Sequence, residues 1–527
     1  MKELAVVGAL TVMILPLVTG CCLCDDDHDP VPNPDAPDKY AVLASTEMAT
    51  EDDVKYNSEF WYDLVLTYCT LIEQGFDKDN IFVLYGDGED GTSKYDRYET
   101  PFCSGAVEKI TDISLKDDND ISKYNLCNVL CCLSSGRPAK IVSGTCKCLS
   151  SGDTGIGGFQ CSDKNIPWLT DDDFLIGWVK GHASAIKCET ALAFKSGTTF
   201  GDTEANTLLD DLKADRWALF FETCDAGGWL ADFQDYDSTA MVVSSSPDVD
   251  ECKQTSWTAW YLEKDSTAGG ETEVVHGRFT YWVNTALRRM DLTGTAVDSD
   301  ADENNLISIL EDFDFAEEKI LEENTKYLDV PPETDFGGVM QPAIHSPSDV
   351  APCVFVRLAN PGGDHEVFSL DHDDDNSTVP SVPPGTVPFD SPDIWVRHDH
   401  SDPVPREHQQ PHAGKDNHVY AQVFNIGCAD PSPVDVLFYY STYTDDILCG
   451  DPTQWKPIGE GTITSLPPGE ARVAHATWQA SNMPEPDDYC LIAELSALED
   501  KPNEDESVAF DNNKAQIKVE VVAADGL

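Results

Sequence analysis

The sequence predicts an α/β domain with a mainly parallel sheet, followed by an all-β sandwich. Three observations support this order. Strand-like apolar runs alternate with helix-like stretches between residues 40 and 247, as in βαβ units. About seven short alternating runs, separated by Pro- and Gly-rich turns, fill residues 392–523. Between them, residues 351–391 are rich in Pro, Gly and Asp, which is typical of an extension and linker.

The first domain, residues 40–350, opens with a βαβ unit. The run YAVLAS (40–45) predicts a strand, apolar residues at helical spacing predict a helix over 60–75, and NIFVLYG (80–86) predicts the next strand. Further runs continue the alternation: DFLIGWVKG (173–181), TEANTLLDDLKAD (203–215), RWALFFETC (216–224) and TAMVVSSSP (239–247). Such a pattern predicts a parallel sheet with helices on both faces.

The N-terminus predicts export. Residues 4–18 are apolar, too few for a comfortable membrane span but enough for the core of a signal peptide over 1–20. The end of this run resembles the prokaryotic lipobox, which implies acylation of Cys21 and a membrane anchor; ordinary cleavage after Gly20 is the alternative. An acidic, Pro-rich tether follows over 21–39. We expect a cell-surface lipoprotein or a secreted protein.

The charge balance excludes one class of partner. The chain has 34 Lys and Arg against 96 Asp and Glu, a formal net charge of −62, so its surface repels nucleic acids and anionic lipids. With 41% hydrophobic residues and 11 Trp, the chain is too apolar to be disordered throughout. The acidity therefore belongs to a folded surface.

Seven of the 18 cysteines lie in an insert over residues 91–170. Their spacing, CxxxCC and CxC, lacks the repeated CxxC pairs of a zinc site, and an exported protein folds in an oxidising compartment. Disulfides are therefore predicted. The odd count requires one partner elsewhere, for example Cys69 or Cys188.

Two strand ends carry the residues for acyl transfer. His182 follows the apolar run 173–181, and Cys224 ends the run 216–224. Because ligands bind beyond the carboxyl ends of strands in an open α/β sheet, neighbouring strands would bring the two side chains together. A thiol beside an imidazole forms a thiolate nucleophile readily. Alternatively, Cys224 is a buried strand-end cysteine and His182 a loop residue.

These motifs resemble those of the caspase-like cysteine peptidases, in particular the legumain-like family and its exported prokaryotic branch. The resemblance covers about 40–345 and rests on YAVLAS, DNIFVLY, GHAS, ETCDAGG and VVSSSP. It implies peptide hydrolysis in which Cys224 attacks the scissile carbonyl and His182 is the general acid and base. It also implies an oxyanion hole formed by the backbone N–H groups of Ala183 and Cys224.

The sequence departs from the family pattern in several places. Ala183 stands where Gly is usual, and Asp225 and Ala226 replace Ser-Gly after the nucleophile. The segment YNSEF resembles the one in which legumains carry the Asn that orients the His, which implies that role for Asn57.

The same segment bears on specificity. Legumains have an Arg near the position of Glu59, so the charge there is reversed. If Glu59 and Glu222 line the primary pocket, the pocket is anionic and favours Arg or Lys. Cleavage after Asn or Asp remains the alternative.

Downstream, an acidic segment has the ligand spacing of an EF-hand loop. Asn305 stands at position 6, where Gly is usual, and the predicted helix after the loop supports a structural calcium ion; a solvated loop is the alternative. The predicted ligands are Asp300, Asp302, Asn304, Leu306 through its carbonyl, Ser308 and Glu311. No cofactor is expected for catalysis.

The region 392–523 resembles the immunoglobulin-like adhesion modules appended to exported enzymes. The segments around Cys428 and Cys490 carry this resemblance, and these two cysteines are predicted to pair between sheets. Histidines 365, 372, 398 and 400 lie among carboxylates and are interpreted as solvated, because no paired metal-ligand spacing repeats.

Together these features predict an exported, surface-anchored cysteine endopeptidase acting on protein or peptide substrates. It would be held at the membrane by a lipid anchor and would not bind nucleic acid. A hypothesis from another class is a non-catalytic adhesion or binding lipoprotein whose caspase-like domain is silent.

Overall fold

A computed structural model gives the fold of the chain, and every structural statement concerns the residues that it describes. These are 38–46, 58–85, 122–149, 159–170, 173–186, 189–194, 197–214, 216–224, 226–233, 239–243, 260–265, 272–292, 294–302, 304, 306–327, 342–345, 351, 367–370, 391–400, 407–443, 452–497, 500–502 and 513–523. The predicted signal peptide, residues 21–37 of the predicted tether, Cys21 and Asn57 lie outside them, whereas β1 already begins at Lys39, within the predicted tether.

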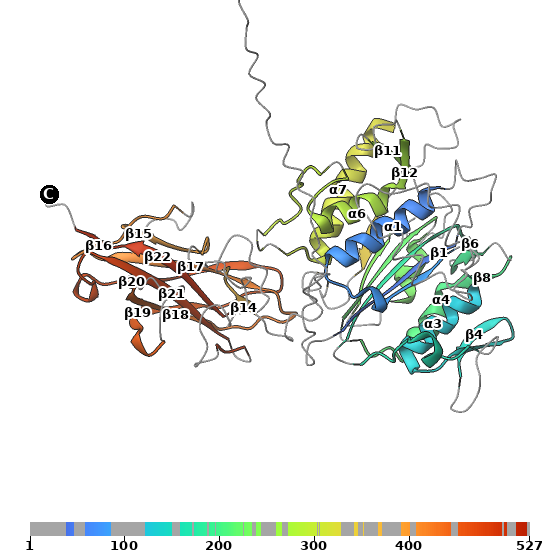
Figure 1. The fold of residues 1–527 in the computed structure, drawn as a ribbon, viewed down its shortest axis with the longest axis horizontal. Coiled ribbons are helices and arrows are strands. Elements are labelled where there is room, and N and C mark those ends of the chain that lie inside the picture. Colours follow the sequence, from blue (N-terminus) through green and yellow to red (C-terminus); the bar gives the residue numbers. More distant parts are fainter. Residues whose placement is uncertain are drawn as a thin grey trace, which may run out of the picture. The chain divides into compact units, whose positions relative to one another are not determined.

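A six-stranded sheet forms the centre of the α/β region, in the order β13-β10-β9-β5-β1-β2 (Figure 1). Five strands of this sheet, β1, β2, β5, β9 and β10, are parallel, and the edge strand β13 is antiparallel to β10. The predicted mainly parallel sheet is therefore confirmed. The strands are β1 (Lys39–Ser45), β2 (Ile81–Leu84), β5 (Phe174–Gly181), β9 (Arg216–Thr223), β10 (Thr239–Val243) and β13 (Ala343–His345).

Helices cover both faces of this sheet because its strands are apolar on both sides. In β1, Ala41 and Leu43 face one hydrophobic core, whereas Val42 and Ala44 face another. One face is covered by α1 (Ser58–Glu73), α6 (Arg278–Arg288) and α7 (Ile309–Tyr327) (Figure 1). The other is covered by α3 (Lys123–Ser135), α4 (Asp202–Leu209) and α5 (Gly227–Asp232).

Three disulfides fasten the Cys-rich region, as its spacing predicts. Cys127–Cys146 and Cys131–Cys148 join α3 to the hairpin of β3 (Ala139–Val142) and β4 (Thr145–Cys148), and Cys132–Cys161 joins α3 to the segment before β5. Bonded sulfurs cannot bind zinc as thiolates. Cys69, one of the two partners proposed from elsewhere in the chain, is also disulfide-bonded.

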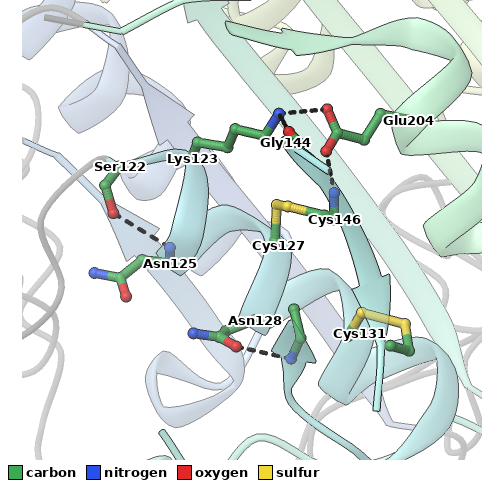
Figure 2. The surroundings of a disulfide bond; sticks show 11 residues. Ser122, Lys123, Asn125, Cys127, Asn128, Cys131, Gly144, Cys146 and Glu204 are labelled. Carbon is green, nitrogen blue, oxygen red and sulfur yellow. Dashed lines mark hydrogen bonds and ion pairs between the residues drawn. A yellow bond between two sulfur atoms is a disulfide. The ribbon is translucent and has the colours of Figure 1, made fainter. Parts of the chain in front are cut away.

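Ionic contacts anchor the same region to α4. Figure 2 shows the Lys123 ammonium between the Gly144 carbonyl, at 2.9 Å, and the Glu204 carboxylate, at 2.8 Å. Glu204 also accepts a hydrogen bond from the N–H of Cys146. Covalent and ionic links therefore hold this region on one face of the sheet.

Smaller elements surround the strand ends. β6 (Ala183–Ile186), β7 (Glu189–Ala193) and β8 (Thr199–Gly201) form a small antiparallel sheet, and β11 (Trp260–Asp265) pairs with β12 (Thr272–Gly277). Two 3-10 turns, η1 (Lys78–Asn80) and η3 (Ser162–Lys164), complete this region.

The C-terminal region is all β. Two antiparallel sheets contribute side chains to one shared core. The first contains β14 (Val367–Phe368), β15 (Ile394–Arg397), β17 (Asn417–Asn425) and β20 (Ala471–Trp478); the second contains β18 (Val434–Thr442), β19 (Lys456–Ile463), β21 (Asp488–Ser496) and β22 (Lys514–Glu520). β16 (His412–Ala413) pairs with β23 (Val522–Ala523), and η6 (Pro452–Gln454) and η7 (Ala480–Asn482) are short turns. Whether this region is immunoglobulin-like stays a prediction.

Two details of this region bear on the sequence analysis. β14 lies within the predicted linker, yet it pairs with Phe424 and Asn425 of β17. Cys428 and Cys490 are both disulfide-bonded, and their pairing with each other stays a prediction. Leu491 faces the shared core, so Cys490 points to the opposite face of β21.

Within the described ranges, no helix combines the length and the apolar character that crossing a bilayer requires.

Candidate active site

The register of two parallel strands places the candidate nucleophile and base. Gly181, the last residue of β5, is the partner of Thr223, the last residue of β9. The next residues along the two chains are His182 and Cys224, and neighbouring strands lie about 4.8 Å apart. The two predicted residues therefore leave adjacent strands side by side, at the same edge of the sheet.

Gly181 is needed for this arrangement. A Cβ atom at this position would overlap the hydroxyl of Thr46, which follows β1. The backbone of Thr46 approaches closely because its N–H donates to the carbonyl of Lys180, at 2.9 Å. The glycine in the sequence GHAS thus allows the ends of β1 and β5 to meet directly beside His182.

Cys224 is a free thiol, and its residue is partly exposed. The other cysteines that the structure describes, nine in all, are disulfide-bonded. Among the described cysteines, Cys224 is therefore the one whose thiol is available for chemistry, and it lies partly accessible at a strand end.

The backbone around His182 is fixed by β7. The N–H of Ala193 donates to the carbonyl of His182 at 2.8 Å, while Ala183 is opposite Leu192. In this pattern Ala183 and Leu192 form a non-hydrogen-bonded pair, so the N–H of Ala183 points away from β7. Ala183 does not belong to the described residues with positive φ, so alanine fits here without strain.

A buried ionic cluster lies directly beneath these strand ends. Lys180 and Glu222 are partners in the β5–β9 register, two residues before His182 and Cys224, and the Lys180 ammonium is 3.5 Å from the Glu222 carboxylate. Lys180 also contacts the carboxylate of Asp63 in α1. Both acidic side chains are completely buried, so their charges depend on Lys180 for compensation.

The junction between β12 and α6 also contacts the ionic cluster. Asp63 accepts a hydrogen bond from the N–H of Gly277, at 2.9 Å, and lies 2.9 Å from Nδ1 of His276. A side chain at position 277 would overlap both Glu222 and Lys180, so only glycine fits there. This junction is therefore shaped around the ionic cluster.

Phe60 in α1 links the cluster to the candidate base. Its ring lies 5.7 Å from the ring of His182, between centroids, and the Lys180 ammonium lies 5.2 Å from its centroid. The Phe60 ring therefore lies near both the ionic cluster and the candidate base.

Glu222 is not placed as the sequence analysis expected. Its carboxylate accepts hydrogen bonds from the N–H and the hydroxyl of Thr280, and its side chain is buried beside Lys180. Burial raises the pKa of Glu222, and Lys180 acts in the opposite direction. Because this carboxylate is buried and already bonded to Lys180 and Thr280, Glu222 does not supply the free anionic wall that was predicted. The side chain of Glu59 lies outside the described residues.

Sequence reasoning missed Asp63, Lys180 and His276. A signal for one of them was present, because Lys180 interrupts the otherwise apolar run 173–181. A charged residue inside a buried strand requires a partner.

The predicted calcium loop brings its acidic residues together. Oxygens of Asp300, Asp302 and Glu311 all lie within 4.8 Å of one another. Glu311 accepts hydrogen bonds from the N–H groups of Ala301, at 2.9 Å, and Ser308, at 3.0 Å. The remaining predicted ligands lie in the same loop, where the N–H of Asn304 donates to Asp300 at 2.9 Å and Leu306 donates to the Asn304 side chain at 2.7 Å.

This cluster is electrostatically costly without a cation. Burial raises the pKa of Asp302 to about 8, and the carboxylates of Glu311 and Asp300 add to the shift. Burial also raises the pKa of Glu311. Arg289 offsets part of the charge, with its guanidinium 3.0 Å from Asp300. Carboxylate and amide oxygens are the donors that calcium prefers, so the donor set fits this ion.

Comparisons with known proteins give little further support. No family model and no curated protein matches the chain. Among solved structures, it is similar to pro-sf-caspase-1 (11% identity, 59% of this chain and 91% of the other, TM-score 0.29). It is also similar to the CARDB domain of a Pyrococcus furiosus protein solved with di-metal ions (18% identity, 25% of this chain and 86% of the other, TM-score 0.15). A third similar structure is the C-terminal domain of wzt (11% identity, 25% of this chain and 72% of the other, TM-score 0.16). TM-scores this low do not support inference about function.

Proposed function

We propose that the protein is a cysteine endopeptidase whose catalytic dyad is Cys224 and His182. The observation that carries this proposal is the β5–β9 register. It places the free thiol of Cys224 and the imidazole of His182 directly after neighbouring strand ends. A catalytically silent binding protein would have no need of this pairing, nor of an unoxidised cysteine among disulfides.

The dyad would perform acyl transfer in two steps. The thiol proton of Cys224 passes to His182, and the thiolate forms a bond to the carbonyl carbon of the scissile peptide. His182 then protonates the leaving amine as the C–N bond breaks, which leaves a thioester on Cys224. A water molecule, deprotonated by His182, hydrolyses the thioester and frees the thiol.

The tetrahedral oxyanion needs donors, and two backbone groups are suitable. The N–H of Ala183 is not used by the β6–β7 pairing, and the N–H of Cys224 belongs to the nucleophile itself. Removing one donor from an oxyanion hole typically costs about 2.7–4 kcal/mol of transition-state stabilisation. Asn57 would orient His182, as the family resemblance implies.

An activity-based probe tests this proposal. A peptidyl acyloxymethyl ketone should alkylate Cys224 as its carboxylate leaves, and mass spectrometry should place the thioether on the peptide that contains Cys224. The reaction should require His182 and should persist in His398→Ala, which removes an exposed histidine of the C-terminal region. An unlabelled wild type would favour the silent binding protein, and equal labelling of His182→Ala would contradict the dyad.

The primary specificity now depends on Glu59. Because Lys180 and Thr280 already occupy the Glu222 carboxylate, a preference for Arg or Lys needs Glu59 as the anionic group. We expect a peptide library to show cleavage after Arg or Lys, and Glu59→Gln to reduce it. Cleavage after Asn or Asp by the wild type would refute the anionic pocket but not the dyad.

We also propose that residues 300–311 bind a structural calcium ion. Millimolar Ca²⁺ should raise the melting temperature, because an ion that binds only the folded state stabilises it by mass action. Asp300→Ala combined with Glu311→Ala should remove this increment, whereas Glu318→Gln, on the exposed part of α7, should keep it. An equal shift with Na⁺ at matched ionic strength would contradict a specific site.

The three disulfides are typical of proteins that fold in an oxidising compartment, which supports export. We propose that protein or peptide substrates are met outside the cytoplasm, with Cys21 as the lipid anchor.

A further inference from the structure

Three histidines gather on one face of the sheet formed by β15, β17 and β20. In β17, His418 is the partner of Thr477, and in β20, His475 is the partner of Tyr420, so both histidines lie on the same sheet face. Val419 and Ala474, their neighbours in sequence, face the shared core. The histidine face is therefore the outer one. His400, three residues after β15, joins them there.

The separation of the rings suits a shared ligand. The centroid of the His400 ring is 5.1 Å from that of His418 and 4.5 Å from that of His475. Two imidazoles that bind one zinc ion at about 2.0–2.1 Å, with roughly tetrahedral angles, have centroids about 5 Å apart. The His400 ring thus lies at a suitable distance from each of the other two rings for a shared metal ion.

The rings are stacked rather than convergent, with interplanar angles of 22° and 20°. Binding therefore requires them to turn about their side-chain torsions. His400 and His475 are exposed and His418 is partly exposed, so this rotation does not disturb the core. His400 lies beside both other rings, which makes it the central ligand.

Nearby charges also act on this histidine face. The carboxylates of Asp399 and Asp416 act on His418 and attract a cation to this face. Arg397, which acts on Tyr420, partly offsets them.

We propose that His400, His418 and His475 bind one divalent transition-metal ion of the zinc and copper class. Imidazole nitrogen selects such ions over calcium, so this site differs in chemistry from the acidic loop at residues 300–311. The solvated interpretation of His400 is thereby replaced. A bound ion would tie the segment after β15 to β17 and β20, adding a cross-link on the outer face of the sheet.

Metal titration of the full chain tests this proposal. The Cys224→Ala protein, in excess Ca²⁺ to occupy oxygen sites, is titrated with Zn²⁺ by calorimetry, and Cu²⁺ is then used to identify ligands by electron paramagnetic resonance. We expect one saturable equivalent of Zn²⁺ and nitrogen hyperfine structure on Cu²⁺. Loss of even an outer-shell partner costs about 10–100-fold in metal affinity, so His400→Ala, His418→Ala and His475→Ala should each lose at least that much.

His398→Ala is the matched control. This histidine is near in sequence to His400 and exposed, but its ring pairs with His412 instead, at 3.9 Å between centroids. We expect its affinity for Zn²⁺ to be unchanged, and circular dichroism should show all four variants folded. Absence of saturable binding, a Cu²⁺ spectrum without nitrogen coupling, or an equal loss in His398→Ala would each overturn the proposal.

Discussion

Replacing Cys224 with Ala is expected to abolish peptide hydrolysis while the domain stays folded. Cys224 is partly exposed, whereas the preceding residues of β9 are buried. Its replacement therefore removes the nucleophile and little core packing. We expect the hydrolysis rate to fall by about a thousandfold or more. His182→Ala should give a similar loss, because neither thiolate formation nor protonation of the leaving amine can then proceed. Rates with a fluorogenic peptide would measure both.

The double variant makes this test specific to a dyad. If the two side chains act as one unit, Cys224→Ala combined with His182→Ala should lose no more than either single variant. Asn57→Ala should lose less, because its proposed role is to orient His182. Retained hydrolysis in Cys224→Ala would end the peptidase assignment, and additive losses would indicate that the two residues work separately.

Replacing Lys180 with Met should cause the largest loss of stability. This change leaves the carboxylates of Asp63 and Glu222 buried together without their shared cation. Breaking a buried ion pair from one side typically costs about 3–5 kcal/mol, so the free energy of unfolding should fall by that amount. Chemical denaturation followed by tryptophan fluorescence would measure it.

A partial rescue and a matched control complete this test. Glu222→Gln, added to Lys180→Met, removes one of the two uncompensated charges and should recover part of the lost stability. Lys147→Met, at an exposed lysine in β4, should change stability by less than about 0.5 kcal/mol. If Lys180→Met is as stable as Lys147→Met, the ionic cluster does not contribute to folding.

The dyad could be predicted from sequence because it depends on local patterns. The runs ending in Gly-His and Thr-Cys are each readable as buried strands, and parallel strands present their carboxyl ends at one edge. The structure adds the register, which pairs Gly181 with Thr223. Similarly, the spacing of Asp300, Asp302 and Glu311 specifies a loop in which these residues converge, since they are close in sequence.

The ionic cluster could not be predicted because its members come from four distant segments. Asp63 and Lys180 are 117 positions apart, and Asp63 and His276 are 213 apart. No periodicity links such residues. The short strand β14 was missed for a different reason: two residues within a Pro- and Asp-rich stretch give no alternation, and only the pairing with β17 makes them a strand.

The two faces of the central sheet are secured by different combinations of bonds. The face covered by α3 and α4 carries three disulfides, whereas the face covered by α1, α6 and α7, where Cys69 is also disulfide-bonded, includes Ile307 and Ile309, next to the acidic loop. The three disulfides form once, when the chain first enters an oxidising environment, and their contribution to stability is then constant. The other face also holds the ionic cluster beneath the dyad. With calcium bound as proposed, the stability of that face changes with the calcium concentration of the medium throughout the life of the protein.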